Sequence, residues 1–199
     1  MGNCYPDKII NIALTEVGYK EKASNKDLYD KDKNAGHANY NKYANDIDTY
    51  YPNFYNGKKN GFDWCAVFVD WLFIKAYGYD DALRLTCQPE HSLGASCTFS
   101  YKYYATKKQT GSTPKLGAQI FFGDKSTKTC THTGLVVDYD NEYVTTVEGN
   151  ASDGVYKKKY PLSDSKIYGY GYPDYSKADN VFTVDVESTK YNKIVINLK

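Results

Sequence analysis

Residues 63–78, with the sequence DWCAVFVDWLFIKAYG, form the most apolar segment of the chain. A length of about fifteen residues fits a buried helix better than a strand, because strands usually run for about 4 to 8 residues. Asp63 is suited to cap the start of this helix and Gly78 to end it. The segment therefore predicts a buried helix that carries Cys65 in its first turn.

Shorter patterned segments surround this helix. Apolar residues at near-helical spacing predict helices at residues 6–17, 39–48, 80–87 and 92–106. In the second half, short β-rich runs between Gly, Asp and Asn turns predict strands at residues 118–122, 133–138, 143–147, 155–160 and 167–172. Helices first and strands second are typical of an α+β domain, with N-terminal helices packed on a mostly antiparallel β-sheet.

The end of the chain reads as an addition to this domain. We expect one domain over residues 1–175, with a short linker at residues 176–179. Residues 181–186 and 194–198 then predict two more strands. The extension over residues 176–199 is either the start of a truncated second domain, which we favour, or an extra hairpin of the same sheet.

Charge and cysteine content exclude several classes of protein. Twenty-five Lys and Arg against 24 Asp and Glu leave a net charge of +1, so we expect no nucleic-acid partner. No apolar run approaches the ~18 residues of a membrane span, and the N-terminus lacks the apolar core of a secretory signal. We therefore expect a monomer made in the cytoplasm, without membrane insertion. Five cysteines without a C-x-x-C pair argue against zinc, and a chain without a secretory signal is expected to keep its thiols reduced.

Cys65 is a candidate nucleophile, because unpaired N–H groups and the helix dipole in a first turn lower the pKa of a thiol. The alternative is a buried structural thiol, since Cys is among the most buried residues. A cysteine nucleophile needs a base, and the chain has three histidines. His37 and His91 read as exposed loop residues. His132 instead opens a strand-like run in which Gly134 leaves room for close approach.

A carboxylate opposite His132 follows from one hairpin register. If residues 139–141 form a three-residue loop with Asn141 in the left-handed conformation, opposing residue numbers add up to 280 and His132 faces Glu148. A two-residue turn would rotate Glu148 to the other face. Asn150 shares the face of Glu148 if the strand continues. Glu148 could then fix the tautomer of the His132 ring.

Taken together, three motifs resemble the CHAP domains, the cysteine- and histidine-dependent amidohydrolases/peptidases of the papain-like superfamily. The resemblance covers about residues 5–175. It is carried by residues 63–69 (DWCAVFV), 132–136 (HTGLV) and 147–150 (VEGN). The order of these motifs matches the family, in which the cysteine begins a helix and the histidine and acidic or amide residues lie on the following sheet. Asp63 departs from the family, which often has proline there.

The resemblance implies a papain-like fold and hydrolysis of bacterial peptidoglycan, at the amide between sugar and stem peptide or at a peptide bond of the stem or cross-bridge. Carried over by position, Cys65 is the nucleophile and His132 the base and then the acid. Glu148 and Asn150 orient the histidine. The backbone N–H of Cys65 is a candidate oxyanion donor, and the side chain of Asn60 is a second one.

The biological setting is predicted more coarsely. We expect a phage endolysin-like hydrolase that acts on the cell wall after release. The alternatives are a bacterial autolysin or element-borne lysin with the same chemistry, and a non-catalytic module that binds the wall. We expect no cofactor and no metal. Some family members bind calcium near the cysteine, but Asp27, Asp30 and Asp32 do not have the spacing of the EF-hand loop.

Overall fold

The computed structural model describes residues 5–178 of the 199-residue chain. The apolar segment forms helix α3 (Cys65–Tyr77), in which every residue except Lys75 is buried. Burial on all sides explains why its sequence has no polar face. Four further α-helices lie within the described residues: α1 (Tyr5–Glu16), α2 (Lys42–Tyr50), α4 (Tyr79–Leu85) and α5 (Cys97–Thr106).

The strands form one antiparallel sheet in the order β1-β6-β2-β3-β4-β5. Their bounds are β1 (Thr110–Gly111), β2 (Gln119–Asp124), β3 (Thr129–Tyr139), β4 (Tyr143–Glu148), β5 (Tyr156–Pro161) and β6 (Ile167–Gly171). Strand β3 lies in the centre, between β2 and β4. The two strands predicted to carry His132 and Glu148 are therefore direct neighbours.

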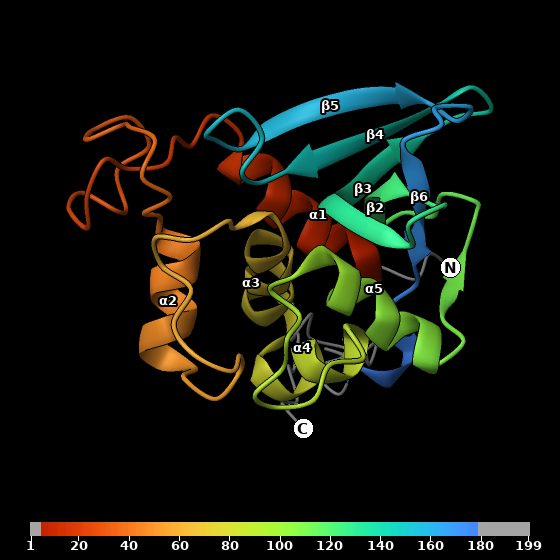
Figure 1. Ribbon diagram of the computed structural model, residues 1–199, viewed down its shortest axis with the longest axis horizontal. Helices are drawn as coiled ribbons and strands as arrows, with labels where there is room; N and C mark the ends of the chain where they lie inside the picture. Colours follow the sequence, from red (N-terminus) through yellow and green to blue (C-terminus); the bar gives the residue numbers. More distant parts are fainter. Residues whose placement is uncertain (1–4, 179–199) are drawn as a thin grey trace, which may run out of the picture.

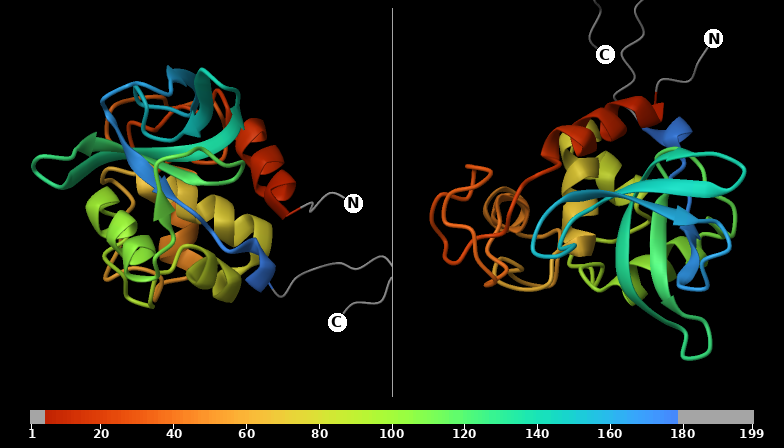
Figure 2. Two further views of the ribbon diagram at one scale, coloured as in Figure 1. Left: turned by 90° about the vertical axis from the view of Figure 1, so that its right-hand side faces the viewer. Right: turned by 90° about the horizontal axis from the view of Figure 1, so that it is seen from above.

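The helices pack beneath the sheet, as Figures 1 and 2 show. The larger core cluster joins α1, α2 and α3 to the sheet, and it contains Trp64 and Phe68 of the α3 region together with Leu135 of β3 and Val147 of β4. A second cluster on alternate residues of the strands includes Val136. This packing places the N-terminal end of α3 against the central strands.

The predicted α+β class with helices packed on an antiparallel sheet is confirmed. The predicted helices and strands occur with shifted ends, whereas the two-residue strand β1 was not predicted. A 3-10 helix, η1 (Tyr175–Lys177), follows β6, and the ring of Tyr175 stacks on Phe73 of α3. The strands predicted at residues 181–186 and 194–198 lie outside the described residues, and the division at residue 175 stays a prediction.

Candidate active site

The start of α3 is fixed by the buried side chain of Trp64. Its indole Nε1 donates a hydrogen bond to Oε2 of the buried Glu21 at 3.0 Å, and its ring stacks on Tyr43. Trp64 is the N-cap residue and no side chain caps the helix. The predicted cap by Asp63 is therefore wrong, because Asp63 is exposed and the helix begins two residues later. Cys65 is the first helical residue, where backbone N–H groups are unpaired.

The thiol of Cys65 is poised to ionise. A hydrogen bond with the Cys97 thiol, at 3.3 Å between the two Sγ atoms, lowers its pKa, and the His132 ring and the Ala66 N–H act in the same direction. Burial opposes them, but the pKa still falls to about 5. At neutral pH the thiol is then a thiolate, which is the nucleophilic form of cysteine.

His132 lies between Cys65 and Glu148. Nε2 of its ring is 2.9 Å from Oε2 of Glu148, which leaves Nδ1 as the ring nitrogen that faces the thiol. Burial lowers the pKa of His132. Hydrogen bonds and charge interactions with Cys65 and Glu148 outweigh burial and raise the pKa to about 9. Between pH values of about 5 and 9 the site therefore holds a thiolate and an imidazolium.

Glu148 is fully buried and has four polar neighbours, of which His132 is the first. Oε1 accepts a hydrogen bond from the Thr146 hydroxyl at 2.6 Å, and Oε2 accepts one from the Tyr160 hydroxyl at 3.2 Å. The ammonium of Lys158 lies 3.7 Å from Oε2. Burial raises the pKa of Glu148, but the bonds with His132 and Thr146 outweigh it and hold the pKa below its usual range. Glu148 is thus an anion, and hydrogen bonds to both of its carboxylate oxygens fix its position.

The predicted register of the β3–β4 hairpin is wrong in detail. Leu135 pairs with Val147 and Tyr139 pairs with Val144, so four residues, 140–143, lie between the last paired residues, and a bulge separates Val136 from Asp138. The turn is closed by Asp140, whose Oδ1 accepts the N–H groups of residues 142 and 143. Asn141 does not have a positive φ. A turn governed by the Asp140 side chain replaced the expected three-residue loop.

Glu148 reaches His132 diagonally across Gly134. In the observed register Gly134 is the residue opposite Glu148, and a Cβ atom at position 134 would lie 2.6 Å from Cγ of Glu148. The Glu148 side chain therefore lies over the glycine backbone on its way to the histidine. The close approach that the sequence predicted at Gly134 is observed, although its neighbour is Glu148.

The other predicted site residues lie elsewhere. Asn150 follows β4 in a bend with φ +53°, so the strand does not continue to it, and no hydrogen bond of the described residues joins it to His132. The amide of Asn60 bonds to Asn41 and Asn25 in the loops before α3, which leaves the Cys65 N–H as the candidate oxyanion donor. His37 is exposed and pairs with Asp153 at 2.6 Å. His91 is exposed too.

Cys97 is the residue of the site that the sequence analysis missed. The sequence indicates only a reduced thiol at this position, and the four cysteines within residues 5–178 are free. Cys97 begins helix α5, which places it against Cys65, the first residue of α3. No motif spacing links the two positions, so only the presence of a second cysteine near a helix start could have pointed to it.

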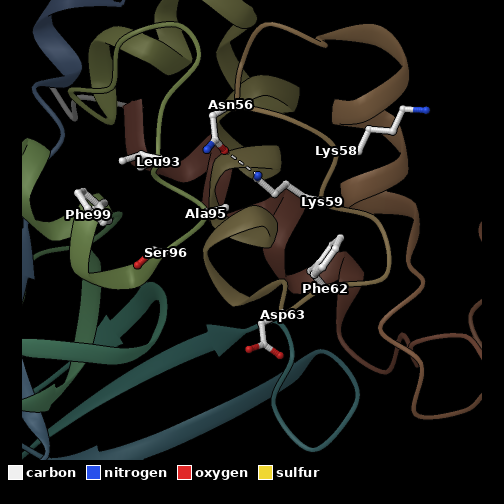
Figure 3. A pocket seen from close by; sticks show the side chains of 9 residues that line it. All are labelled: Asn56, Lys58, Lys59, Phe62, Asp63, Leu93, Ala95, Ser96 and Phe99. Atoms are coloured by element: carbon white, nitrogen blue, oxygen red, sulfur yellow. Dashed lines mark hydrogen bonds between the residues drawn. The ribbon is translucent and has the colours of Figure 1, made fainter.

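A groove of about 380 Å³ is lined by residues that precede the two cysteines in the chain. Its walls are the loop before α3 and the loop before α5, as Figure 3 shows. Asp63 lines it two residues before Cys65, and Ser96 lines it one residue before Cys97. The exposed apolar side chains of the groove are Phe62, Leu93 and Phe99. The groove is therefore a largely apolar surface formed by the segments that lead into Cys65 and Cys97.

The acidic residues named as alternative calcium ligands form no metal cluster. Within residues 5–178, no group of three His, Cys, Asp or Glu side chains is placed to hold an ion. Oδ1 of Asp30 accepts the N–H groups of Asp32 and Lys33, and Asp30 also pairs with the Lys33 ammonium at 3.5 Å. The carboxylate of Asp30 is thus engaged in hydrogen bonds and an ion pair within its own loop. The expectation that the protein needs no metal or other cofactor stays a prediction.

The chain is similar to one family model and to solved structures. Residues 57–150 match the model of the CHAP domain family. No curated protein gives a significant match. Among solved structures, the chain is similar to the one described as "The crystal structure of Ly7917", with 11% identity and a TM-score of 0.47. That alignment covers 84% of this chain and 62% of the other, so this chain spans less than two thirds of that protein. The segment that carries Cys65, His132 and Glu148 thus lies within the part of the chain that matches the CHAP domain family model.

Proposed function

We propose that this protein hydrolyses peptidoglycan by cysteine nucleophilic catalysis. The observation that carries the proposal is the sequence of contacts from Cys65 through His132 to the buried Glu148. A thiolate beside an imidazolium that is oriented by a third group is the arrangement that activates a cysteine nucleophile. The CHAP match supports peptidoglycan as the substrate.

The proposed reaction has two steps. The Cys65 thiolate attacks the carbonyl carbon of the scissile amide, and the N–H of Cys65 stabilises the oxyanion that forms. His132 then transfers its Nδ1 proton to the leaving amine as the C–N bond breaks, which leaves a thioester on Cys65. In the second step His132 takes a proton from water, and the hydroxide hydrolyses the thioester to a carboxylic acid. Glu148 stabilises the imidazolium in both steps.

The groove lined by Asp63 and Ser96 supports a peptide substrate. Its apolar residues Phe62, Leu93 and Phe99 suit the alanine side chains and methylene groups of a stem peptide or cross-bridge. Lys59 lies on the same surface, where its ammonium bonds to Asn56 at 2.8 Å. We propose that the scissile peptide lies along this groove with its carbonyl carbon at the thiolate. Both the N-acetylmuramoyl-L-alanine amidase and the endopeptidase reaction fit this placement.

We retain the endolysin-like role as the proposed biology, in which the enzyme acts on the cell wall after its release. A bacterial autolysin or an element-borne lysin uses the same residues and the same reaction. The distinction between these roles depends on the setting in which the protein is produced, whereas the chemistry depends on Cys65. The chemistry is therefore the part to test first.

The test is mass spectrometry of purified peptidoglycan digested at neutral pH by the wild type and by Cys65→Ala, with and without calcium. We expect new fragments from the wild type alone, and the newly freed termini identify the bond that is cut. Cys87→Ala serves as the matched control, because Cys87 is a free thiol whose hydrogen bond is to Gln109. Equal results for wild type and Cys65→Ala across several wall types would instead support a non-catalytic binding module.

A further inference from the structure

The contact between two thiols at the start of two helices is not used by the reaction as described above. Sγ of Cys97 lies 3.3 Å from Sγ of Cys65, and both residues are 6% exposed. Each is the first residue of its helix, α5 and α3 respectively. At this distance one thiol donates a hydrogen bond to the other sulfur, so the position of one proton decides the chemistry of the pair.

The surroundings of the two sulfurs place that proton on Cys97. Cys65 faces the His132 ring, whose positive charge favours a thiolate. Cys97 is packed with Tyr104 and Phe121, and within residues 5–178 its side chain has no hydrogen bond other than the one to Cys65. A thiol in apolar surroundings without a cation stays protonated. The bond to Cys65 and burial together raise the pKa of Cys97 well above its usual value.

The position of Cys97 is fixed by the strand that carries His132. The hydroxyl of Thr98, the next residue of α5, accepts the N–H of Cys130 at 3.0 Å and donates to the Cys130 carbonyl at 3.2 Å. Cys130 lies two residues before His132 on β3. The start of α5 is therefore bonded to the strand that carries the histidine. This contact fixes the position of Cys97 relative to His132.

We propose that Cys97 is a third catalytic group of this site, which donates its S–H to the Cys65 thiolate. The inference rests on the proposed role of Cys65 as the nucleophile. In this arrangement the hydrogen bond from Cys97 keeps Cys65 ionised in the resting enzyme. That hydrogen bond breaks when Sγ of Cys65 attacks the substrate. The S–H donor lowers the basicity of the thiolate and also holds its direction.

Few titratable groups surround the nucleophile. The pKa of Cys65 therefore reports directly on its contact with Cys97. His132 faces Cys65 from β3, and Cys97 faces it from α5. Tyr55, in the loop before α3, interacts with Cys65 electrostatically. Cys130 of β3 interacts electrostatically with Cys97. A variant at Cys97 therefore changes one of the two side chains that favour the Cys65 thiolate and leaves His132 in place.

The experiment measures the rate at which iodoacetamide alkylates Cys65 as a function of pH, under reducing conditions, with peptide mapping to separate the cysteines. For the wild type we expect a midpoint near pH 5. Because a hydrogen bond to a charged group shifts a pKa by about one to two units, Cys97→Ala should raise the midpoint by that amount. Cys97→Ser keeps a donor and should stay within about half a unit of the wild type. Cys87→Ala is the control and should match the wild type.

The outcomes separate this inference from the proposed function, because alkylation needs no substrate. A midpoint that is the same in the wild type, Cys97→Ala and Cys97→Ser overturns the inference, even if the enzyme cleaves peptidoglycan. A midpoint that rises only in Cys97→Ala supports it, even if no wall is cleaved. If Cys97→Ala does not fold, Cys97→Val fills the volume of the thiol without a donor, and the same comparison with Cys97→Ser applies.

Discussion

Replacement of Glu148 by glutamine separates the charge of the carboxylate from its shape. The side-chain carbonyl of the new glutamine can still accept from Nε2 of His132, and its amide can donate to the Thr146 hydroxyl, which accepts as well as donates. The substitution therefore keeps the hydrogen bonds and removes the negative charge that stabilises the imidazolium. We expect Glu148→Gln to fold and to lose activity.

The magnitude follows from the contact between Glu148 and His132. A hydrogen bond between charged groups contributes a stabilisation of about 1.5–3 kcal/mol, and one pKa unit corresponds to about 1.4 kcal/mol. Loss of the charge should therefore lower the pKa of His132 by about one to two units from its value of about 9. The imidazolium is the acid that protonates the leaving amine, and its fraction at pH 8 falls from about 0.9 to between about 0.5 and 0.1, so kcat/KM at pH 8 should fall by about 2- to 10-fold.

The assay is the pH profile of kcat/KM on a soluble peptidoglycan fragment. Activity needs a pH above the pKa of Cys65 and below the pKa of His132, so the wild-type profile should be a plateau between about 5 and 9. In Glu148→Gln the upper limb should move to lower pH while the lower limb stays in place. Glu142→Gln, on the exposed β3–β4 turn, is the matched control. A folded Glu148→Gln enzyme with an unchanged upper limb and full activity would refute the role of the carboxylate.

Three further substitutions test the supports of the site. Gly134→Ala places a Cβ atom 2.6 Å from Cγ of Glu148 and should lower kcat/KM by at least about tenfold through displacement of that side chain, with little change in Tm; unchanged kcat/KM would contradict the close approach. Trp64→Phe removes a buried donor to Glu21 and should lower the free energy of unfolding in urea by about 1–3 kcal/mol, an effect that Tyr50→Phe on the surface should not produce. Burial raises the pKa of Asp70 to about 7, above its unfolded value, so the wild type loses stability from this group as the pH rises from about 4 to 7. Asp70→Asn should therefore gain about 3 kcal/mol relative to the wild type between pH 5 and pH 8, and a pH-independent difference would show that the group does not titrate in this range.

The fold and the main contact of the site were predictable for identifiable reasons. Helix α3 is recognisable because its residues, Lys75 excepted, are buried over a length that strands rarely reach. Cys65 and His132 stood out because one begins that helix and the other is the histidine on a central strand. The cap was mispredicted because Trp64 anchors the helix by burial and a bond to Glu21, and that tertiary contact overrides the local preference for Asp at a helix start.

Asn150 and Cys97 show where prediction from sequence ends. Placement of Asn150 beside the histidine required the strand to continue past Glu148, but Gly149 packs directly on Phe68 and the chain turns there. Contact between Cys97 and Cys65 depends on how two helices pack against each other. Packing of this kind leaves no periodic signal in the sequence, because any residue at the start of α5 would be compatible with the helix itself.

The contact between His132 and Glu148 was predicted through a register that the structure does not have, and the reason is parity. Near the turn, opposing residue numbers add up to 283, as in the pair of Tyr139 with Val144. If that odd register continued, Glu148 would pair with Leu135 and lie on the face of the sheet opposite to His132. The bulge after Val136 absorbs one residue and changes the sum to 282, which is even, as in the predicted register. Gly134 then provides the space for Glu148 to cross from its own pair to the histidine. The bulge and the glycine therefore act together: the first returns the carboxylate to the correct face, and the second lets it reach the ring.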